Sequence, residues 1–342
     1  MTSSLFLRVR SAGVFVSLVA SAALTACTPD QPTAPAVNVP TDASASLGSE
    51  RGTLCLRCTP VGQIAYVKAD PTKFLGGHIW IMNADTTAKT QLTFGTSDED
   101  MPAWSPDYKK IAFTSNRRGT YELFVINADG TGLKALTTAV NGSRDDYPSW
   151  APDGSKIYFA RYTSDPVKFT WRSEIYSVNA DGSGFTKVSN DRANLYMPTV
   201  SPDGNRIAVT RLASNSWVDA RIFTMNTNGS ALKQLTFGST GDGDQAWSPD
   251  GSKLVYVCSE GMPDFREICV VNADGTGAKT LVMMAGEQDA PNFSRDGSRV
   301  IFETYSLGNF GRLITVQANG VGGNVLEAAN DPMTYYSAAW AR

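Results

Sequence analysis

The chain has 342 residues, of which 42% are hydrophobic and 18% charged, a balance that suits one globular repeat domain plus a tail. Its net charge is −3, and it becomes −5 without residues 1–26, which contain Arg8 and Arg10 but no acidic residue. This mild acidity, with no basic stripe, argues against a nucleic acid partner.

The N-terminal residues 1–26 have the pattern of a secretory signal peptide. Arg8 and Arg10 precede an apolar run that ends at Leu24 and is too short to span a bilayer. Leu24-Thr25-Ala26-Cys27 resembles a bacterial lipobox, which implies cleavage before Cys27 and lipidation of its thiol. The residue after Cys27 is Thr28 rather than Asp, which resembles the pattern of lipoproteins sent to the outer membrane. The alternative is an ordinary signal peptide followed by an incidental cysteine.

Residues 27–61 are predicted to be a lipidated, flexible tether, because residues 28–50 are rich in Pro, Thr, Ala and Ser and almost lack large apolar residues. The tether contains Cys55 and Cys58 in a Cys-Leu-Arg-Cys element. A haem site would need histidine at position 59, which is Thr59, and a zinc site would need more ligands than the single histidine of the chain, His78, supplies. A local disulfide is therefore the favoured interpretation.

Cys258 and Cys269 flank an apparent hairpin loop from Gly261 to Arg266. Export implies an oxidising compartment, in which disulfides are the default state of paired cysteines. We expect the two residues to lie directly opposite each other on adjacent strands and to form a disulfide.

One turn motif recurs along the chain: a large residue, then Ser-Pro-Asp-Gly or a close variant, then an apolar strand. Pro presets φ, Asp hydrogen-bonds its own backbone and Gly accepts positive φ. The first positions, spaced by 46, 50, 47 and 46 residues, are Trp104, Trp150, Val200, Trp247 and Phe293. A further 47 residues lead to Trp340. A period in the forties with fixed turn chemistry is typical of propeller blades.

A second motif, an apolar strand that ends in an Asn-Ala-Asp-Gly-like turn, occurs six times. Six such hairpins and five complete turn motifs imply that the stretch from Tyr335 to Trp340 supplies the missing inner strand of the first blade. We predict an all-β fold: a six-bladed β-propeller of four-stranded antiparallel blades over residues 62–342, closed by the C-terminal strand joining the first blade. The nearly continuous apolar strands fit blades that are buried on both faces.

The paired motifs resemble the WD40-like (PD40) repeats of the TolB propeller domain, which also resemble those of tricorn-type and prolyl-oligopeptidase-type propellers. The resemblance covers roughly residues 62–342. TolB carries an N-terminal α/β domain and is a soluble periplasmic protein, whereas this chain has the predicted tether and lipid anchor, so we expect a TolB-like lipoprotein rather than TolB itself.

In an antiparallel meander both tight turns of a blade lie at one end, and the longer loops share the opposite face, where binding residues usually lie. Large aromatic residues occur in the loops between second and third strands. These partner-contact candidates are Phe74, Tyr121, Phe169, Trp171, Trp217, Phe265 and Phe310. The alternative is that these rings fold back over the blade edges.

The loops that enter the inner strands carry Asp100, Asp146, Asp244 and Asp289, which we expect to converge at the mouth of the central channel. Clustered carboxylates repel one another unless a cation offsets them, so this mouth is a candidate site for Ca²⁺ or for a positively charged peptide segment. A solvated acidic rim is the alternative, and no other cofactor is indicated.

Signals of catalysis are few, since the chain has no Gly-x-Ser-x-Gly motif and only one histidine. The function predicted first is a non-catalytic, monomeric binding protein that is held on the outer membrane by lipid alone and binds an envelope protein or peptide through its loop face. The alternatives are a cation-dependent hydrolase or lyase acting on a sugar or lactone through the carboxylates, and a glycan-binding propeller.

Overall fold

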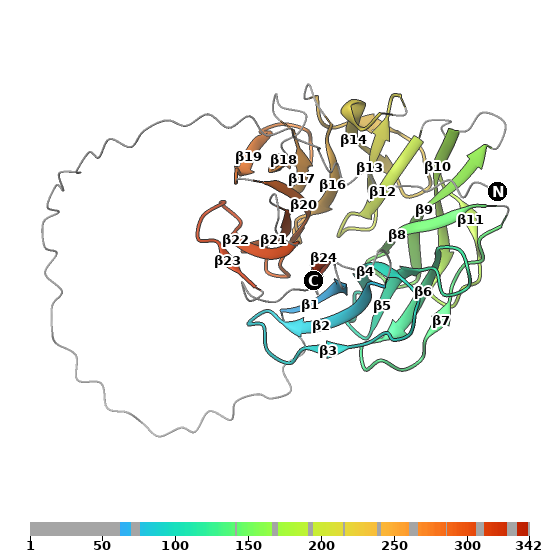
Figure 1. The fold of residues 1–342 in the computed structure, drawn as a ribbon. Helices are drawn as coiled ribbons and strands as arrows, with labels where there is room; N and C mark the ends of the chain where they lie inside the picture. Colours follow the sequence, from blue (N-terminus) through green and yellow to red (C-terminus); the bar gives the residue numbers. More distant parts are fainter. Residues whose placement is uncertain are drawn as a thin grey trace, which may run out of the picture. The chain divides into compact units, whose positions relative to one another are not determined.

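The computed structural model of the protein describes residues 62–69, 76–140, 142–165, 170–190, 194–214, 216–237, 241–259, 266–284, 286–305, 311–326 and 334–340. They belong to one compact unit, Cys55–Arg342. Their strands form six four-stranded antiparallel sheets, and the one helical element among these residues is a short 3-10 helix, η1 (Trp217–Asp219). This confirms the predicted all-β, six-bladed propeller (Figure 1).

From the inner to the outer strand, blade 1 consists of β24 (Thr334–Trp340), β1 (Gln63–Ala69), β2 (His78–Asn83) and β3 (Thr90–Gln91), and blade 2 of β4 (Glu99–Trp104), β5 (Lys110–Ser115), β6 (Glu122–Asn127) and β7 (Lys134–Ala135). In the same order, blade 3 consists of β8 (Arg144–Trp150), β9 (Lys156–Asp165), β10 (Thr170–Asn179) and β11 (Thr186–Lys187), and blade 4 of β12 (Asn194–Val200), β13 (Arg206–Leu212), β14 (Ala220–Asn226) and β15 (Lys233–Gln234). Blade 5 consists of β16 (Gly243–Trp247), β17 (Lys253–Cys258), β18 (Glu267–Asn272) and β19 (Lys279–Val282), and blade 6 of β20 (Glu287–Phe293), β21 (Arg299–Tyr305), β22 (Arg312–Gln317) and β23 (Asn324–Val325).

The ring closes through blade 1, which combines the two ends of the propeller sequence. β24 pairs with β1 in a register that places Trp340 opposite Ile64 and Tyr336 opposite Val67. The six inner strands β24, β4, β8, β12, β16 and β20 contact one another in this cyclic order. The closure inferred from the count of turn motifs is therefore correct.

Six buried clusters of the core lie one between each pair of neighbouring blades, and a seventh, smaller cluster of Tyr196, Met197, Leu212 and Ala220 lies at the loop end of blade 4. Successive residues of a strand point to opposite neighbours: Ile64 and Tyr66 of β1 pack toward blade 6, whereas Ala65 and Val67 pack toward blade 2. Both faces of each sheet are therefore apolar, which accounts for the nearly unbroken apolar strands of the sequence.

The Ser-Pro-Asp-Gly turns are structural, as their chemistry predicts. In blade 5, Asp250 accepts hydrogen bonds from the Ser248 hydroxyl (2.6 Å) and the Ser252 amide (2.9 Å), and Gly251 has a φ of 69°. The preceding Trp247 donates its indole N–H to the carbonyl of Thr199 in blade 4 (3.0 Å). The motif therefore shapes its own hairpin and also joins it to the preceding blade.

Two departures from the turn motif meet in space. In blades 3 to 6 the glycine of each turn faces the proline of the preceding blade's turn, as Gly154 faces Pro106. Blade 1 has no such turn, because its inner strand ends the propeller sequence. Arg295 replaces proline in blade 6, Tyr108 replaces glycine in blade 2, and the Arg295 guanidinium lies 4.8 Å from the centroid of the Tyr108 ring. These two long side chains, from blades 6 and 2, therefore contact each other across the position where blade 1 lacks the turn.

Cys258 and Cys269 form a disulfide with a Cα–Cα distance of 5.8 Å. The expectation that they lie directly opposite each other is wrong, because β17 and β18 pair Cys258 with Glu267 and Tyr256 with Cys269. The bond is diagonal across the two strands. Within the described residues, no helix has the length and apolarity needed to cross a membrane.

Candidate binding face

Every inner strand has a β-bulge near its loop end. The pairing of each inner strand with the second strand of its blade shifts there, next to a residue with φ between 49° and 57°. The six residues are Met101, Tyr147, Met197, Asp244, Ala290 and Ser337. A non-glycine residue in this region costs about 1–2 kcal/mol. The bulges re-aim the side chains around the axis of the propeller, and backbone strain of this kind is concentrated at functional sites.

A set of polar side chains, which we call the polar arc, joins blades 5, 6, 1 and 2 at these bulges. It comprises Asp244, Arg266, Asp289, Glu303, Ser337 and Asp100. The Ser337 hydroxyl donates to Asp100 (2.7 Å), and the Ser337 amide donates to Glu303 (3.1 Å). On the other side of Glu303, Arg266 pairs with Asp289 at 2.7 Å.

Asp244 is the most perturbed carboxyl of the polar arc. Its pKa lies well above the usual value because the group is desolvated, and the hydrogen-bonded Asp289 and nearby Glu303 add negative charge, which Arg266 only partly offsets. A nearby cation favours the ionised form of such a carboxyl. The polar arc can therefore bind a cationic group with release of a proton.

A second set, which we call the aromatic arc, covers blades 2, 3 and 4 and comprises Tyr121, Arg144, Tyr162, Tyr196 and Trp217. The Arg144 guanidinium lies 4.6 Å from the Tyr121 ring centroid and 5.6 Å from that of Tyr162. The ring centroids of Tyr162 and Tyr196 are 5.3 Å apart, as are those of Tyr196 and Trp217. This arc ends in the partly exposed indole of Trp217 on η1 (44% exposed).

The tyrosines of the aromatic arc stay protonated at neutral pH. Burial raises the pKa of Tyr196 to about 12 and that of Tyr162 well above its usual value. The pKa of Tyr121 is also raised, first by burial and then by Asp98, which accepts a hydrogen bond from its hydroxyl (2.9 Å). The face thus combines apolar rings with hydroxyl groups and a cation.

The four predicted aspartates do not form one set. Asp100, Asp244 and Asp289 belong to the polar arc, whereas Asp146 pairs with Arg144 of its own strand at 2.6 Å and so lies beside the aromatic arc. Among the described residues, no group of three or more His, Cys, Asp or Glu side chains is arranged to hold a metal ion.

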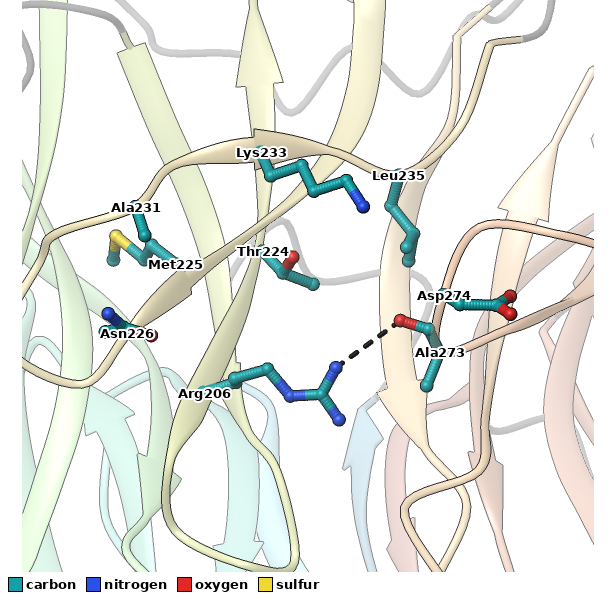
Figure 2. A pocket seen from close by; sticks show the side chains of 9 residues that line it. All are labelled: Arg206, Thr224, Met225, Asn226, Ala231, Lys233, Leu235, Ala273 and Asp274. Atoms are coloured by element: carbon teal, nitrogen blue, oxygen red, sulfur yellow. Dashed lines mark hydrogen bonds between the residues drawn. The ribbon is translucent and has the colours of Figure 1, made fainter.

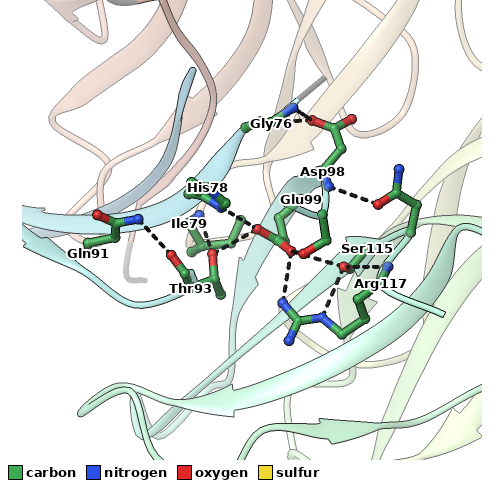
Figure 3. Close-up of polar contacts among 12 residues, drawn as sticks. Gly76, His78, Ile79, Gln91, Thr93, Asp98, Glu99, Ser115 and Arg117 are labelled. Atoms are coloured by element: carbon green, nitrogen blue, oxygen red, sulfur yellow. Dashed lines mark hydrogen bonds and ion pairs between the residues drawn. The ribbon is translucent and has the colours of Figure 1, made fainter. Parts of the chain in front are cut away.

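Figure 3 shows how the loop end of blade 2 is fixed to blade 1 by the fully buried Glu99, which directly precedes Asp100. Its carboxylate accepts hydrogen bonds from His78 (2.8 Å), Arg117 (2.8 Å) and Thr93 (3.0 Å), and from the hydroxyls of Ser97 and Ser115. The single histidine of the chain is therefore engaged in a contact between blades. This network positions the start of β4, and hence Asp100.

Large apolar side chains are exposed at the loop end outside the two arcs. They include Phe94 (68% exposed), Val140 (55%), Phe237 (75%) and Met283 (71%), each just beyond the outermost strand of a blade. Aromatic residues and methionine are enriched where proteins bind proteins. The loop end thus has an apolar rim around the two arcs.

A pocket of about 440 Å³ lies away from this face, between the outer parts of blades 4 and 5 (Figure 2). Two cations, Arg206 and Lys233, line it, and Arg206 donates to the carbonyl of Ala273 (3.4 Å) and lies 4.9 Å from the Trp247 ring centroid. Lysine or arginine begins the second strand of blades 2 to 6 alike, as at Lys110 and Lys253. We therefore interpret Arg206 as a contact of the repeat and assign the pocket no ligand.

Of the predicted contact residues, Tyr121 and Trp217 are the two ends of the aromatic arc. Phe74, Phe169, Phe265, Phe310, the side chain of Trp171, and Cys27, Cys55 and Cys58 lie outside the described residues. The sequence pattern did not predict Arg144, Arg266, Glu303 or Ser337. A signal for Glu303 exists, since it lies in an apolar strand where the other blades have small or apolar residues, such as Val67 and Thr114.

This architecture is that of a closed β-propeller, with tight, structural turns at one end and an irregular face that carries the two arcs at the other. The family model described as the TolB beta propeller domain (PD40) matches residues 73–171 and 167–342. The chain belongs to this family.

Individual relatives match part of the chain. The "Protein TolB homolog" of Chlorobium luteolum is 28% identical over 143 residues, which are 40% of this chain and 30% of that protein. The "Tol-Pal system protein TolB" of Anaeromyxobacter dehalogenans is 30% identical over 112 residues, 33% of this chain and 24% of that protein. The chain thus spans less than a third of the length of these relatives. The crystal structure of TolB from Acinetobacter baumannii superposes with a TM-score of 0.70 at 22% identity, covering 83% of this chain and 67% of that one, a likeness that shows the fold.

Proposed function

We propose that this protein is a non-catalytic binding protein of the bacterial envelope, anchored to the outer membrane through a lipidated Cys27, and that its loop face binds an envelope protein. The observation that carries the proposal is the loop end itself, where two chemically different arcs lie within a rim of exposed apolar side chains. Membership of the TolB propeller family supports a protein as the partner.

The two arcs suggest which parts of a partner each would bind. The polar arc, with more carboxylates than cations, suits a lysine or arginine side chain of the partner. The aromatic arc suits apolar or aromatic side chains, and Trp217 is the type of residue that dominates binding energy in interfaces. A partner segment with a basic residue near apolar ones fits both.

The test is capture of partners from envelopes that have been crosslinked in the cell, with the mature chain as bait. Trp217→Ala should lose a specific partner that the wild-type chain retains, because a truncated aromatic hot spot costs about 2 kcal/mol or more, a loss of about thirtyfold or more in affinity. The matched control is Leu133→Ala at the opposite end, where Leu133 is equally exposed (44%). Equal retention by both variants would contradict the assignment of the face.

A further inference from the structure

We infer that the opposite end of the propeller, which we call the turn face, rests on an anionic phospholipid surface. This inference rests on the proposed lipid anchor and extends it, since it adds a direct contact of the folded domain with the membrane. The turn face is the end at which the Ser-Pro-Asp-Gly and Asn-Ala-Asp-Gly turns lie.

The first observation is the distribution of lysine. Of the ten lysines among the described residues, nine lie at the turn end, all exposed, and Lys68 is the exception. With Arg206, Arg295 and Arg299 they outnumber the nine aspartates of the same turns, together with Glu174, which pairs with Lys187 at 2.7 Å, by two charges. The loop end carries the carboxylates of the polar arc instead. The propeller therefore has a positive end, although the chain as a whole is acidic.

The second observation concerns how the aspartates of the turns are used. Asp107, Asp153 and Asp250 each accept a side-chain hydrogen bond and a backbone hydrogen bond within their own turn. The lysines that follow these aspartates, such as Lys109, Lys156 and Lys253, begin or precede the second strands and extend outward as exposed side chains. The lysines are therefore exposed cations available to a phosphate headgroup, whereas these aspartates are engaged within their own turns.

The third observation is where the chain enters the propeller. Gly62 lies against Ala84 of the β2–β3 turn and against Trp340, so β1 starts at the turn face. The 34 residues between Cys27 and Gly62, predicted to be a tether, would have a root-mean-square length of roughly 30–35 Å as a flexible coil. A lipid anchor joined to this end brings the turn face, rather than the loop face, toward the membrane.

These observations give one orientation. The turn face contacts the anionic leaflet through its lysines, with Leu133 (44% exposed) and Val321 (56% exposed) among the side chains nearest the lipid. The loop face then points away from the membrane that holds the anchor, toward the partner. Each lysine close to an anionic surface raises the partition constant of the protein onto that surface by about fivefold.

The test is hydroxyl-radical footprinting of the full mature protein on vesicles of phosphatidylethanolamine with phosphatidylglycerol, compared with vesicles of phosphatidylcholine. We expect oxidation of Leu133 and Val321 to fall on the anionic vesicles only, and oxidation of Phe94 and Phe237 at the loop end to stay unchanged. Salt of about 1 M, which reduces the Debye length to about 3 Å, should restore oxidation at the turn face.

Variants separate charge from folding. The triple variant Lys109→Glu, Lys156→Glu, Lys253→Glu should abolish the protection, whereas the control Arg118→Glu, Arg172→Glu at the loop end, where both side chains are about half exposed (48% and 46%), should retain it. Protection of Phe94 and Phe237 instead, or equal protection on both kinds of vesicle, would overturn the inference. A chain with a histidine tag in place of the lipid, captured on nickel-chelating vesicles, gives the same test if Cys27 proves unlipidated, so failure of the anchor and failure of the orientation are distinguishable.

Discussion

The strand that closes the ring gives the sharpest prediction about stability, through two tryptophans in different environments. Trp340 at the end of β24 is 5% exposed and packs between blades 6 and 1 with Ile64, Met82 and Leu313. Trp217 on η1 is 44% exposed at the loop face. The same substitution, tryptophan to alanine, therefore tests closure at one site and leaves it intact at the other.

Removing a buried tryptophan side chain costs about 3–5 kcal/mol, because transfer energy is lost and a cavity remains. A domain of this size has a total stability of about 5–15 kcal/mol. We expect Trp340→Ala to lower the melting temperature by roughly 6–20 °C, at about 2–4 °C per kcal/mol for domains of comparable length. Trp217 is partly exposed and contacts the ring of Tyr196, an aromatic pair that contributes about 0.5–1.5 kcal/mol, so Trp217→Ala should lower the melting temperature by only about 1–6 °C.

The assay is thermal unfolding followed by circular dichroism, with both variants at equal concentration. A melting temperature of Trp340→Ala within about 2 °C of the wild-type value would refute the closed ring, since an open stack would leave β24 dispensable. A large fall for Trp217→Ala would show that η1 is part of the core instead of a contact surface.

Three further experiments test other contacts. The pKa of Asp244 is raised on folding, so the stability that its proton contributes is complete below pH about 4 and is lost as pH rises through the raised pKa. Asp244→Asn should therefore be more stable than the wild type at pH 9, and its melting temperature should depend less on pH. Glu99→Ala should lower the free energy of unfolding, measured by chemical denaturation, by about 3–5 kcal/mol, because it leaves Arg117 without its buried partner. A loss of less than about 1 kcal/mol would contradict the role of Glu99. Arg295→Ala and Tyr108→Asn should couple by about 0.5–1 kcal/mol in a double-mutant cycle, whereas additive effects would show that the bridge contributes nothing.

Much of the fold was predictable because the repeat encodes it locally. Each Ser-Pro-Asp-Gly turn fixes a hairpin by its own hydrogen bonds, and counting the turns against the second motif leaves one inner strand for Trp340 to complete. The register of the hairpin that carries Cys258 and Cys269 was predicted wrongly. Symmetry about the loop places Cys258 opposite Cys269, whereas the observed register places Cys258 opposite Glu267.

The candidate site was predictable only in part, because its geometry depends on which blades are neighbours. Asp100, Asp146 and Asp289 occupy one position of the repeat and look equivalent in the sequence. Their partners are not equivalent: Asp100 meets Ser337 of the closing strand, Asp146 meets Arg144 of its own strand, and Asp289 meets Arg266 of the preceding blade. Contacts that differ in this way from blade to blade leave no periodic signal.

The proposed function depends most on the claim that the loop face is where a protein partner binds. Photocrosslinking in living cells tests it most directly, with a photoreactive amino acid placed at Phe94, Trp217 or Phe237 on the loop face and at Leu133 or Val321 on the turn face. We expect discrete protein adducts from the three loop-face positions and none from the two turn-face positions. Protein adducts from the turn face alone, or from both faces equally, would contradict the claim.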